Sequence, residues 1–376
     1  MSQPLRDLYA LDSFNDTYAL GHYARVVDAR HIPSRQSVAL KVLRPEHLAN
    51  NDTTLRWEVR AFPNEADLLV RLGNSPYTVN LLDCGYLSGV GEAPSGGEVV
   101  SFGVDVAAYT NGLRDYVLAG WRPYLALELL PRTHNLFYLM RPGNAGTRRR
   151  LPTEEGLALA LQFAELLRTA HRQRIVYLDH KLEHVFWDGV RLRVIDFNSS
   201  KLLAPTAADI AQQFQRDIHN LCVGILYPIF TGLSPVAGAL RPQPGGQSDV
   251  ESRYSDITTL DFGVEPSLSS ALTGLLQRGA SMDIGSIDAF LSQLQEVAAL
   301  HGWDFADTYT SPSSRVARAH LRDGLKHLRD GEEHLRQARE LFREAAITEQ
   351  INGDLEAELR RLVKAVGEAL NQRVIP

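Results

Sequence analysis

The chain has 376 residues, of which 44% are hydrophobic, so it is long enough for two or three units with a sizeable core. Its net charge of −6, with acidic and basic residues mixed along the chain, argues against a general binder of nucleic acids or membrane surfaces. Two cysteines are too few for a disulfide framework and favour a cytoplasmic setting, and we expect neither a signal peptide nor a membrane-spanning segment.

Strand patterns dominate the sequence up to about residue 131. Residues 16–43 alternate apolar and polar side chains, residues 78–85 resemble a strand, and residues 123–131 form a buried run that ends at a proline. Residues 88–97 are rich in Gly, Ser and Pro, which is typical of a loop. Between the strands, residues 54–72 carry apolar side chains at helical spacing. Pro63 and Asn64 predict the start of a helix there, with Glu65 in its first turn.

Helical patterns dominate the sequence after about residue 150. Residues 153–173 are strongly amphipathic, and Thr153 opens this helix with acidic residues in its first turn. Short strands and turns follow to about residue 200, and the remainder is mostly helical apart from a loop near residues 240–250. The sequence therefore predicts an α+β fold with a sheet-rich first part and a helix-rich second part.

A change of composition near residue 314 indicates a C-terminal helical arm. The residues that follow carry many charges of both signs, and apolar side chains recur at spacings of three, four and seven. These side chains are Leu321, Leu325, Leu328, Leu335 and Phe342. Residues 352–354 break the pattern, and a second helix follows, so we expect a helical hairpin or a coiled-coil arm. The arm either packs on its own domain or meets a partner, which would be another protein or a second copy of the chain.

Residues 175–198, IVYLDHKLEHVFWDGVRLRVIDFN, carry two aspartates that each follow a short apolar run. Asp179 is followed by Lys181 two residues later, and Asp196 lies near the end of the stretch. Phosphoryl transfer needs cations on the phosphates, a carboxylate for the metal and a carboxylate that orients the attacking hydroxyl. The alternative is a pair of ordinary β-hairpins with acidic tips, so the choice depends on what the rest of the chain supplies.

Together with motifs elsewhere in the chain, this stretch resembles the eukaryotic-type (Hanks-type) serine/threonine protein kinase family. The motifs follow the order of that family over roughly residues 15–300. They are VALK at 38–41, NEADLLVRL at 64–72, YLALELLP at 124–131, LDHKLEH at 178–184, IDFN at 195–198 and RDIHN at 216–220. The resemblance implies a two-lobed fold, with an antiparallel-sheet lobe over 1–130, a helical lobe over 131–310 and the arm over 311–376.

The resemblance also implies a binding site for ATP. Lys41 would bind the α- and β-phosphates, and Glu65 would pair with Lys41. Leu127 would occupy the gatekeeper position beside the hinge, and the main chain of Glu128 and Leu130 would bind the adenine.

The same resemblance assigns the residues of the transfer itself. Asp179 would orient the acceptor hydroxyl, Lys181 would stabilise the transferred phosphate, and Asp196 would bind Mg²⁺ or Mn²⁺. Asp217 would be the buried aspartate at the start of the helix that supports the loop of Asp179. The implied activity is ATP-dependent phosphate transfer to an alcohol group, with serine or threonine as the acceptor.

The chain departs from the family pattern in the loop that covers the phosphates and in the residues before Asp179. ALGHYA at 19–24 replaces the G-x-G-x-x-G pattern and keeps Gly21, together with Tyr23 as the aromatic tip. Tyr177 and Leu178 replace the histidine and arginine of the family. Without that arginine, a phosphorylated loop has no partner at this position, so switching by that route is not expected.

Two further departures lie at the expected metal site. His184 replaces the asparagine that binds a second metal ion in the family, and imidazole suits Mn²⁺ better than Mg²⁺. Asn198 replaces the glycine that follows Asp196 and Phe197, and asparagine tolerates a left-handed backbone better than most residues. We therefore count His184 with Asp196 as a candidate metal ligand.

Two other functions stay open. A pseudokinase would keep the fold as a scaffold that acts through its C-terminal helices, with a nucleotide as a stabilising ligand only. The second open function is that of a small-molecule kinase. The segment between Asn198 and Asp217 favours it, because this segment is short and offers no obvious platform for a peptide. The chain retains the core charges of the family, and buried charges are costly unless they are paired, which favours retained nucleotide binding.

Other motifs carry no chemistry in this interpretation. His171, His180 and His219 have no spacing that is typical of a metal site. DFGV at 261–264 imitates the metal-binding motif, but it follows the helix of Asp217 and is expected to be a turn.

Overall fold

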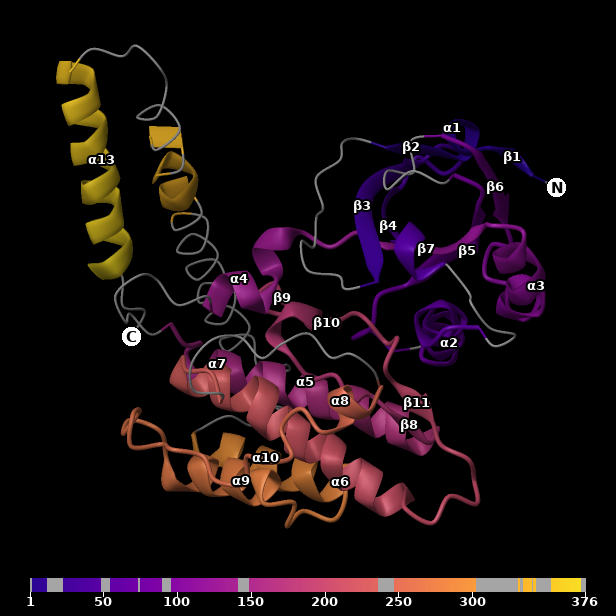
Figure 1. The fold of residues 1–376 in the computed structure, drawn as a ribbon. Helices are drawn as coiled ribbons and strands as arrows, with labels where there is room; N and C mark the ends of the chain where they lie inside the picture. The colour runs from indigo at the N-terminus through magenta and orange to yellow at the C-terminus, as the bar shows by residue number, and fades with distance from the viewer. Residues whose placement is uncertain are drawn as a thin grey trace, which may run out of the picture.

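The structure is a computed structural model that describes residues 2–11, 23–48, 55–73, 75–89, 96–140, 149–235, 247–301, 331, 334–339, 341–342 and 353–372. It confirms an α+β fold, in which an antiparallel sheet lies above a group of helices (Figure 1). We refer to residues 2–128 as the sheet part and to residues 132–301 as the helical part. One continuous apolar core extends from the helix beside the sheet to the helices of the helical part.

Seven strands form the large sheet, in the order β1-β6-β5-β7-β4-β3-β2, with antiparallel pairing throughout. Their bounds are β1 Gln3–Pro4, β2 Tyr9–Leu11, β3 Ala24–His31, β4 Ser37–Leu43, β5 Leu81–Leu87, β6 Glu98–Ser101 and β7 Arg122–Glu128. Two helices pack against strands β5 and β7. They are α2 Trp57–Arg71 and α3 Val106–Leu118. The predicted strands at 78–85 and 123–131 are confirmed as β5 and β7, with bounds that differ by one to three residues at each end.

The N-terminal segment joins the two edges of this sheet, which the sequence did not predict. β1 pairs with β6 at one edge and β2 pairs with β3 at the other, and only the short helix α1, Leu5–Leu8, separates them. The sheet must therefore curl until its edges lie close together, as Figure 1 shows. A second apolar core lies within this curl. It consists of Leu5, Leu8, Tyr9, Val27, Ala29, Val38, Leu40, Val42, Leu87, Val99, Tyr124 and Ala126.

A buried carboxylate fixes the N-terminal segment inside the curled sheet. Asp83 Oδ2 accepts hydrogen bonds from the hydroxyls of Tyr9 and Tyr124, each at 2.6 Å. Asp83 Oδ1 accepts from the hydroxyl of Ser101 at 2.7 Å and from the main-chain amide of Gly103 at 2.8 Å. These four donors give both oxygens of the buried carboxylate hydrogen-bond partners, which a polar group inside an apolar core requires.

Replacing Tyr9 by phenylalanine is expected to lower the free energy of unfolding by about 1.5–3 kcal/mol, because it removes a hydrogen bond to a buried charged group. Denaturant unfolding measures this change. Tyr116→Phe, which removes a hydroxyl outside the Asp83 network, is the control. If the two variants unfold at the same denaturant concentration, the N-terminal segment is not part of the cooperative core.

The helical part is built around α5, Thr153–Arg172, which confirms the predicted amphipathic helix and packs against α10. The other helices here are α4 Leu136–Met140, α6 Ile210–Leu221, a π-helical stretch Cys222–Leu226, α7 Tyr227–Thr231, α8 Gln247–Glu251, α9 Ser270–Ala280 and α10 Ile287–Leu300. The short strands are β8 Ile175–Val176, β9 Val185–Trp187, β10 Leu192–Val194 and β11 Lys201–Leu202. Short 3₁₀ turns lie at Pro45–His47, Arg132–His134 and Leu182–His184.

The predicted start of the helix near Pro63 is wrong. α2 begins at Trp57 and contains Pro63 in its interior, so Glu65 lies in the middle of the helix and not in its first turn. Proline there leaves the carbonyl of Val59 without its helical donor, at a cost of about 3 kcal/mol. The buried face of the helix includes residues before and after the proline, and the burial of these residues outweighs this cost. That face includes Val59, Phe62, Ala66, Leu68 and Leu69.

A second prediction of helix position is also wrong. α6 begins at Ile210, so Asp217 lies in the second half of α6 and not at the start of a helix. Its side chain is fully buried there.

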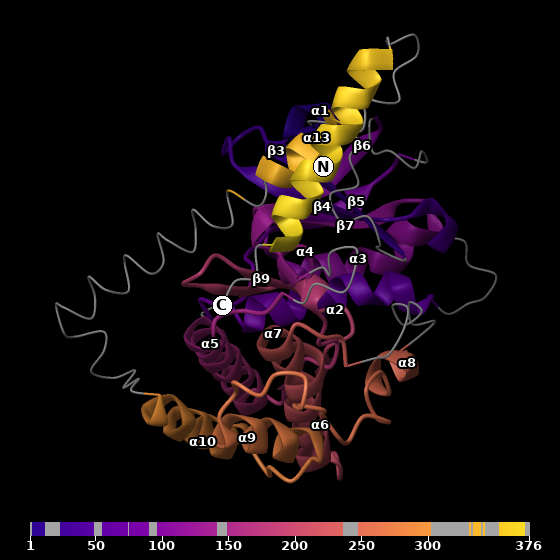
Figure 2. The ribbon, with the colours of Figure 1, turned by 90° about the vertical axis from the view of Figure 1, so that its left-hand side faces the viewer.

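Two helical segments of the expected C-terminal arm are described. α13, Gly353–Gln372, confirms the predicted second helix, and residues 331, 334–339 and 341–342 are helical as well. The helical segment that includes residues 334–339 lies beside α13 in both views (Figures 1 and 2). Arg336 Nη1 donates to the carbonyl of Tyr138 in α4 at 3.5 Å, so the segment contacts the helical part.

The apolar stripe of the arm is only partly described. Leu335 and Phe342 are half-buried, whereas Leu321, Leu325 and Leu328 lie outside the described residues. The coiled coil, the protein partner and the second copy of the chain therefore stay predictions, as do the domain bounds at 130 and 310. Gly21 also lies outside the described residues.

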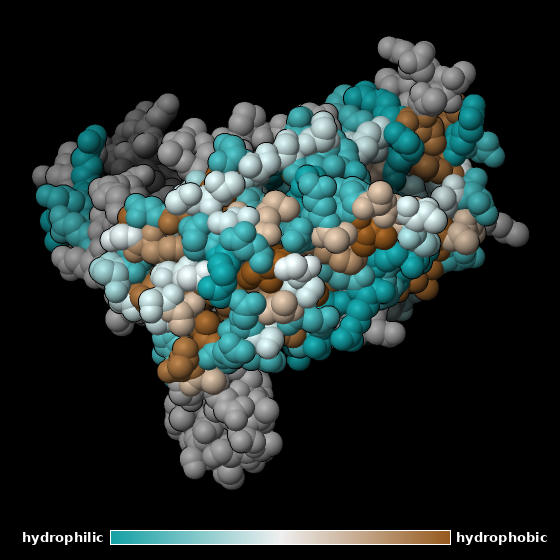
Figure 3. All heavy atoms as spheres, turned by 90° about the horizontal axis from the view of Figure 1, so that it is seen from below, coloured by the Kyte–Doolittle hydropathy of each residue, from teal (hydrophilic) through white to brown (hydrophobic). Residues whose placement is uncertain are grey.

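The surface of the helical part is mixed in character. Seen from below, hydrophobic residues are scattered among hydrophilic ones over the described residues of this face (Figure 3). Among the described helices, none combines the length and the apolar character that a membrane crossing requires.

Candidate functional site

The loop of Asp179 follows β8, and Asp217 of α6 holds its main chain. Asp217 Oδ2 accepts from the amide of Tyr177 at 2.7 Å, and Oδ1 accepts from the amide of Leu178 at 2.8 Å. Asn220 Nδ2 donates to the carbonyl of Leu178 at 2.9 Å. Leu178 has a φ of 68°, a left-handed conformation that is unfavourable for a leucine. These bonds stabilise that turn and so fix the position of Asp179, which lines a cavity formed by residues of the sheet part and the helical part.

Asp196 reaches the same cavity from the end of β10. It has a φ of 64°, which aspartate tolerates better than most residues. Tyr177 ties the two loops together, because its hydroxyl donates to the carbonyl of Ile195 at 2.8 Å and its carbonyl accepts from the hydroxyl of Ser200 at 2.9 Å. The two aspartates thus belong to one site, as the sequence predicted.

Lys41 of β4 joins the sheet to both α2 and the loop of Asp196. Its Nζ lies 2.6 Å from Glu65 Oε2 and 2.6 Å from Asp196 Oδ1, and all three groups are largely buried. Burial lowers the pKa of Lys41, but the carboxylates of Asp196 and Glu65 raise it by more, so its pKa lies well above its usual value. Lys41 is therefore a fixed positive charge. Burial also raises the pKa of Glu65, partly offset by Lys41.

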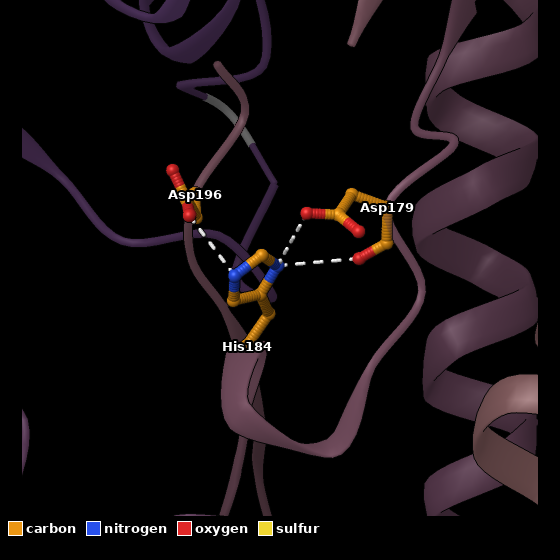
Figure 4. A group of neighbouring side chains, drawn as sticks. All are labelled: Asp179, His184 and Asp196. Carbon is orange, nitrogen blue, oxygen red and sulfur yellow. Dashed lines mark hydrogen bonds and ion pairs between the residues drawn. The ribbon is translucent and has the colours of Figure 1, made fainter. Parts of the chain in front are cut away.

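His184 lies between the two aspartates and contacts both (Figure 4). Its Nε2 lies 2.9 Å from Asp196 Oδ2, and its Nδ1 lies 3.7 Å from Asp179 Oδ2 and 3.2 Å from the carbonyl oxygen of Asp179. Burial raises the pKa of Asp196, but Lys41 and His184 lower it by more, so its pKa lies well below its usual range. The carboxylate of Asp196 therefore stays charged.

The three side chains Asp179, His184 and Asp196 could hold a metal ion, since one potential ligand atom of each lies within 4.8 Å of the others. Two ligands at right angles, each about 2.1 Å from a metal, are separated by about 3.0 Å. The 2.9 Å between His184 Nε2 and Asp196 Oδ2 is compatible with that separation. Binding at this point would require Nε2 to be free of its proton. A set of two carboxylates and an imidazole fits Mn²⁺ better than Mg²⁺.

These charges line a cavity of about 190 Å³ to which both the sheet part and the helical part contribute residues. Lys41, Glu65, Asp179, Lys181, His184 and Asp196 line it, together with Tyr23, Leu127, Glu128 and Leu130. The structure thus brings together every predicted site residue that it describes. The cavity combines a cluster of charges with apolar walls, which suits a ligand that has a charged end and a flat apolar end.

The expected hinge residues differ in their contacts. The main-chain amide of Glu128 donates to the carbonyl of Asn80 at 3.0 Å, and its carboxylate pairs with Arg193. Within the part of the chain that the structure describes, the amide and carbonyl of Leu130 form no hydrogen bond. Leu130 is therefore the better of the two candidates for an amide that binds a ligand.

Tyr23 is not an exposed loop tip. It lies directly before β3, is buried, and its ring packs edge-on against Trp57 and Phe62. Asn198 Nδ2 donates to the Tyr23 hydroxyl. Burial raises the pKa of Tyr23 well above its usual value, so the hydroxyl stays neutral. Tyr23 therefore forms part of the cavity wall and connects the start of β3 with Asn198.

Asp179 is paired with two cations, Lys181 and Arg253, and the sequence did not indicate the second. Lys181 Nζ lies 3.3 Å from Oδ2, and Arg253 Nη2, from a region with no motif, lies 3.0 Å from Oδ1. Burial raises the pKa of Asp179, but Lys181, His184 and Arg253 lower it by more. No sequence signal could have identified Arg253, because it belongs to no motif and lies more than 70 positions after Asp179.

His171, His180 and His219, the other histidines considered in the sequence, lie in structural surroundings. His171 Nε2 lies 3.1 Å from Asp217 Oδ2, and the ring nitrogens of His219 face the carbonyls of Ala280 and Tyr254. Burial lowers the pKa of His180 to about 4, so it is neutral near pH 7. Residues 261–264 include the predicted turn.

A comparison with protein-family models finds none that matches this chain, so the resemblance to kinases rests on the residues described above.

Proposed function

We propose that the protein is an ATP-dependent phosphotransferase of the protein-kinase type that acts on an alcohol group such as that of serine or threonine. The observation that carries the proposal is Lys41, which lies 2.6 Å from both Glu65 and Asp196 in a cavity that Asp179 also lines. A buried lysine between two carboxylates, with a third carboxylate opposite, supplies the charges that phosphoryl transfer requires. On this proposal the sheet part and the helical part are the two lobes of a kinase-like fold.

Each charge then has a role towards ATP. Lys41 would bind the α- and β-phosphates, and Glu65 would keep Lys41 in place because their ion pair is buried. Asp196 and His184 would hold a divalent cation, Mg²⁺ or Mn²⁺, which neutralises charge on the phosphates when it is bound. Leu130, supported by Leu127 and Glu128, would face the adenine.

The acceptor end of the reaction falls to Asp179 and Lys181. Asp179 would accept a hydrogen bond from the attacking hydroxyl. This bond would direct a lone pair of the hydroxyl oxygen towards the phosphorus atom. Because the pKa of Asp179 is lowered, the carboxylate is ionised near pH 7 and can take this role. Lys181, 3.3 Å from Asp179, would stabilise the charge of the transferred group.

A second candidate function is a scaffold that binds nucleotide without transfer. The observation that favours it is that basic side chains of the protein already contact both oxygens of Asp196 and both oxygens of Asp179. The site is thus electrically satisfied without a ligand. Transfer would require Lys41 and His184 to exchange these contacts for phosphate and metal.

Replacing Lys41 by alanine is expected to abolish the rise in melting temperature that ATP with Mn²⁺ or Mg²⁺ produces, because the phosphates lose their cation. At about 100 times its dissociation constant, a ligand stabilises the folded state by roughly 2.7 kcal/mol, which a thermal-shift experiment detects easily. Lys364→Ala, at an exposed lysine of α13, is the control. A Lys41→Ala protein that melts cooperatively and still shows the full shift would contradict the assignment of Lys41.

Replacing His184 by asparagine is expected to reduce a preference for Mn²⁺ over Mg²⁺. The wild-type protein should bind ATP more tightly with Mn²⁺, because an imidazole nitrogen is among its ligands. Titrating ATP with each metal in both proteins measures the ratio of the two affinities. A ratio that is the same in both proteins would show that His184 does not contact the metal.

A further inference from the structure

The α8 segment, residues 247–254, lies against the loop of Asp179 and the residues that follow Asp196. Gln247 Nε2 donates to the carbonyl of Ser199 at 2.7 Å, and Glu251 forms an ion pair with Lys201. At the other end of the segment, the hydroxyl of Tyr254 donates to the carbonyl of His180 at 2.9 Å. These contacts fix the segment to both loops of the candidate site.

Apolar packing strengthens this attachment. Val250 of the α8 segment is buried in a cluster with Val176 and Leu178, directly before Asp179. Gly224 permits the close approach, because a Cβ there would lie 2.5 Å from the carbonyl oxygen of His180 and 2.7 Å from the ring of Tyr254. The α8 segment is thus a packed element of the site and not a loose covering loop.

Arg253 extends from this segment to the carboxylate of Asp179. Its Nη2 lies 3.0 Å from Oδ1, and the Arg253 side chain is only 10% exposed. Lys181 and His184 contact the other oxygen, Oδ2, at 3.3 Å and 3.7 Å. Cations on both oxygens restrict rotation of the carboxylate about its Cβ–Cγ bond. The contact of Arg253 with Oδ1 is an ion pair without the alignment of a hydrogen bond, so it is the charge of Arg253 that attracts this oxygen.

We propose that Arg253 is a positioning residue, which holds the Asp179 carboxylate in the orientation that the acceptor hydroxyl requires. The inference rests on the proposed phosphotransferase function and adds a residue to it. Arg253 would act through Asp179 and would not touch the nucleotide, because it is not among the residues that line the cavity. Loss of Arg253 should therefore lower the turnover of bound ATP and leave ATP binding unchanged.

The experiment uses the full chain and γ-labelled ATP with Mn²⁺ and with Mg²⁺, and it counts both released phosphate and phosphate attached to protein. Arg253→Gln is expected to lower kcat by about 10- to 100-fold, as small displacements of catalytic groups do, with a KM for ATP within about twofold of wild type. Arg253→Lys should regain part of kcat because the charge returns. Arg150→Gln removes an ion pair with Glu265 at 3.2 Å, away from Asp179, and is the matched control.

A second measurement does not depend on turnover. In a double-mutant cycle on unfolding, Arg253→Gln and Asp179→Asn should be coupled by at least about threefold in the unfolding constant, because the two side chains are in contact. An active Arg253→Gln protein with wild-type kcat, or the absence of coupling, would overturn the role of Arg253 and leave the proposed function standing. A wild-type chain that binds ATP but neither hydrolyses nor transfers its phosphate would overturn the proposed function, and the role of Arg253 with it.

Discussion

Replacing Asp217 by asparagine is expected to lower the free energy of unfolding by about 3 kcal/mol. The two oxygens of Asp217 each accept a main-chain amide, from Tyr177 at 2.7 Å and from Leu178 at 2.8 Å. Asparagine has one oxygen and one NH₂ group, so one amide would face another donor in a fully buried position. Chemical denaturation of the purified protein measures the change.

The same helix supplies a control, because Asp209→Asn alters an exposed aspartate directly before α6 and should leave stability essentially unchanged. The pH dependence gives a second check. Burial raises the pKa of Asp217, but the hydrogen bonds with His171 and with the main-chain amide of Leu178 lower it by more, so the folded-state pKa lies below the ordinary value. Its stabilising contribution is present above about pH 4, the unfolded-state pKa, and is lost as the pH falls through the folded-state pKa. The difference between wild type and Asp217→Asn should therefore narrow in acid, and a constant difference would contradict this account of Asp217.

Replacing Asp179 by asparagine is expected to lower phosphate transfer by about 10²- to 10⁴-fold, the range for loss of a general base. The variant keeps the size of the side chain but loses the charge that attracts Lys181 and Arg253. Binding of ATP should persist, because Lys41 and Asp196 are unchanged. Turnover of labelled ATP at saturating nucleotide measures the effect.

Asp188→Asn is the control for this change, since Asp188 caps the exposed turn between β9 and β10 by accepting the amides of Val190 and Arg191. It should retain wild-type turnover. If Asp179→Asn turns over ATP as fast as Asp188→Asn, the carboxylate that lies among these cations does not orient the acceptor.

The sequence predicted those parts of the molecule in which a local pattern determines the structure. The apolar spacing of α5 and the strand patterns of β5 and β7 gave the right elements. The order of motifs along the chain also identified the charges that meet at the cavity, including Lys41 and Asp196. These residues are separated by 155 positions, and only their resemblance to a known arrangement linked them.

The predictions failed where non-local packing determines the structure. Burial of one helix face on both sides of Pro63 overrode the local signal of a helix start. The N-terminal strands have two and three residues, which is too short for any periodicity, and the network of Asp83 that holds them joins residues 74 positions apart. Arg253 has no motif, because its function in this account depends on one distant contact.

The central claim is that the charges around Lys41, Asp179 and Asp196 transfer the γ-phosphate of ATP. The most direct test is to follow labelled γ-phosphate in wild type, Asp179→Asn and Lys41→Ala side by side, with ATP binding measured on the same samples in Mg²⁺ and in Mn²⁺. We expect that wild type binds ATP and transfers its phosphate, that Asp179→Asn binds without transfer, and that Lys41→Ala does neither. A wild-type protein that binds ATP in either metal and leaves all of the label on the nucleotide would contradict the claim and identify the chain as a nucleotide-binding scaffold.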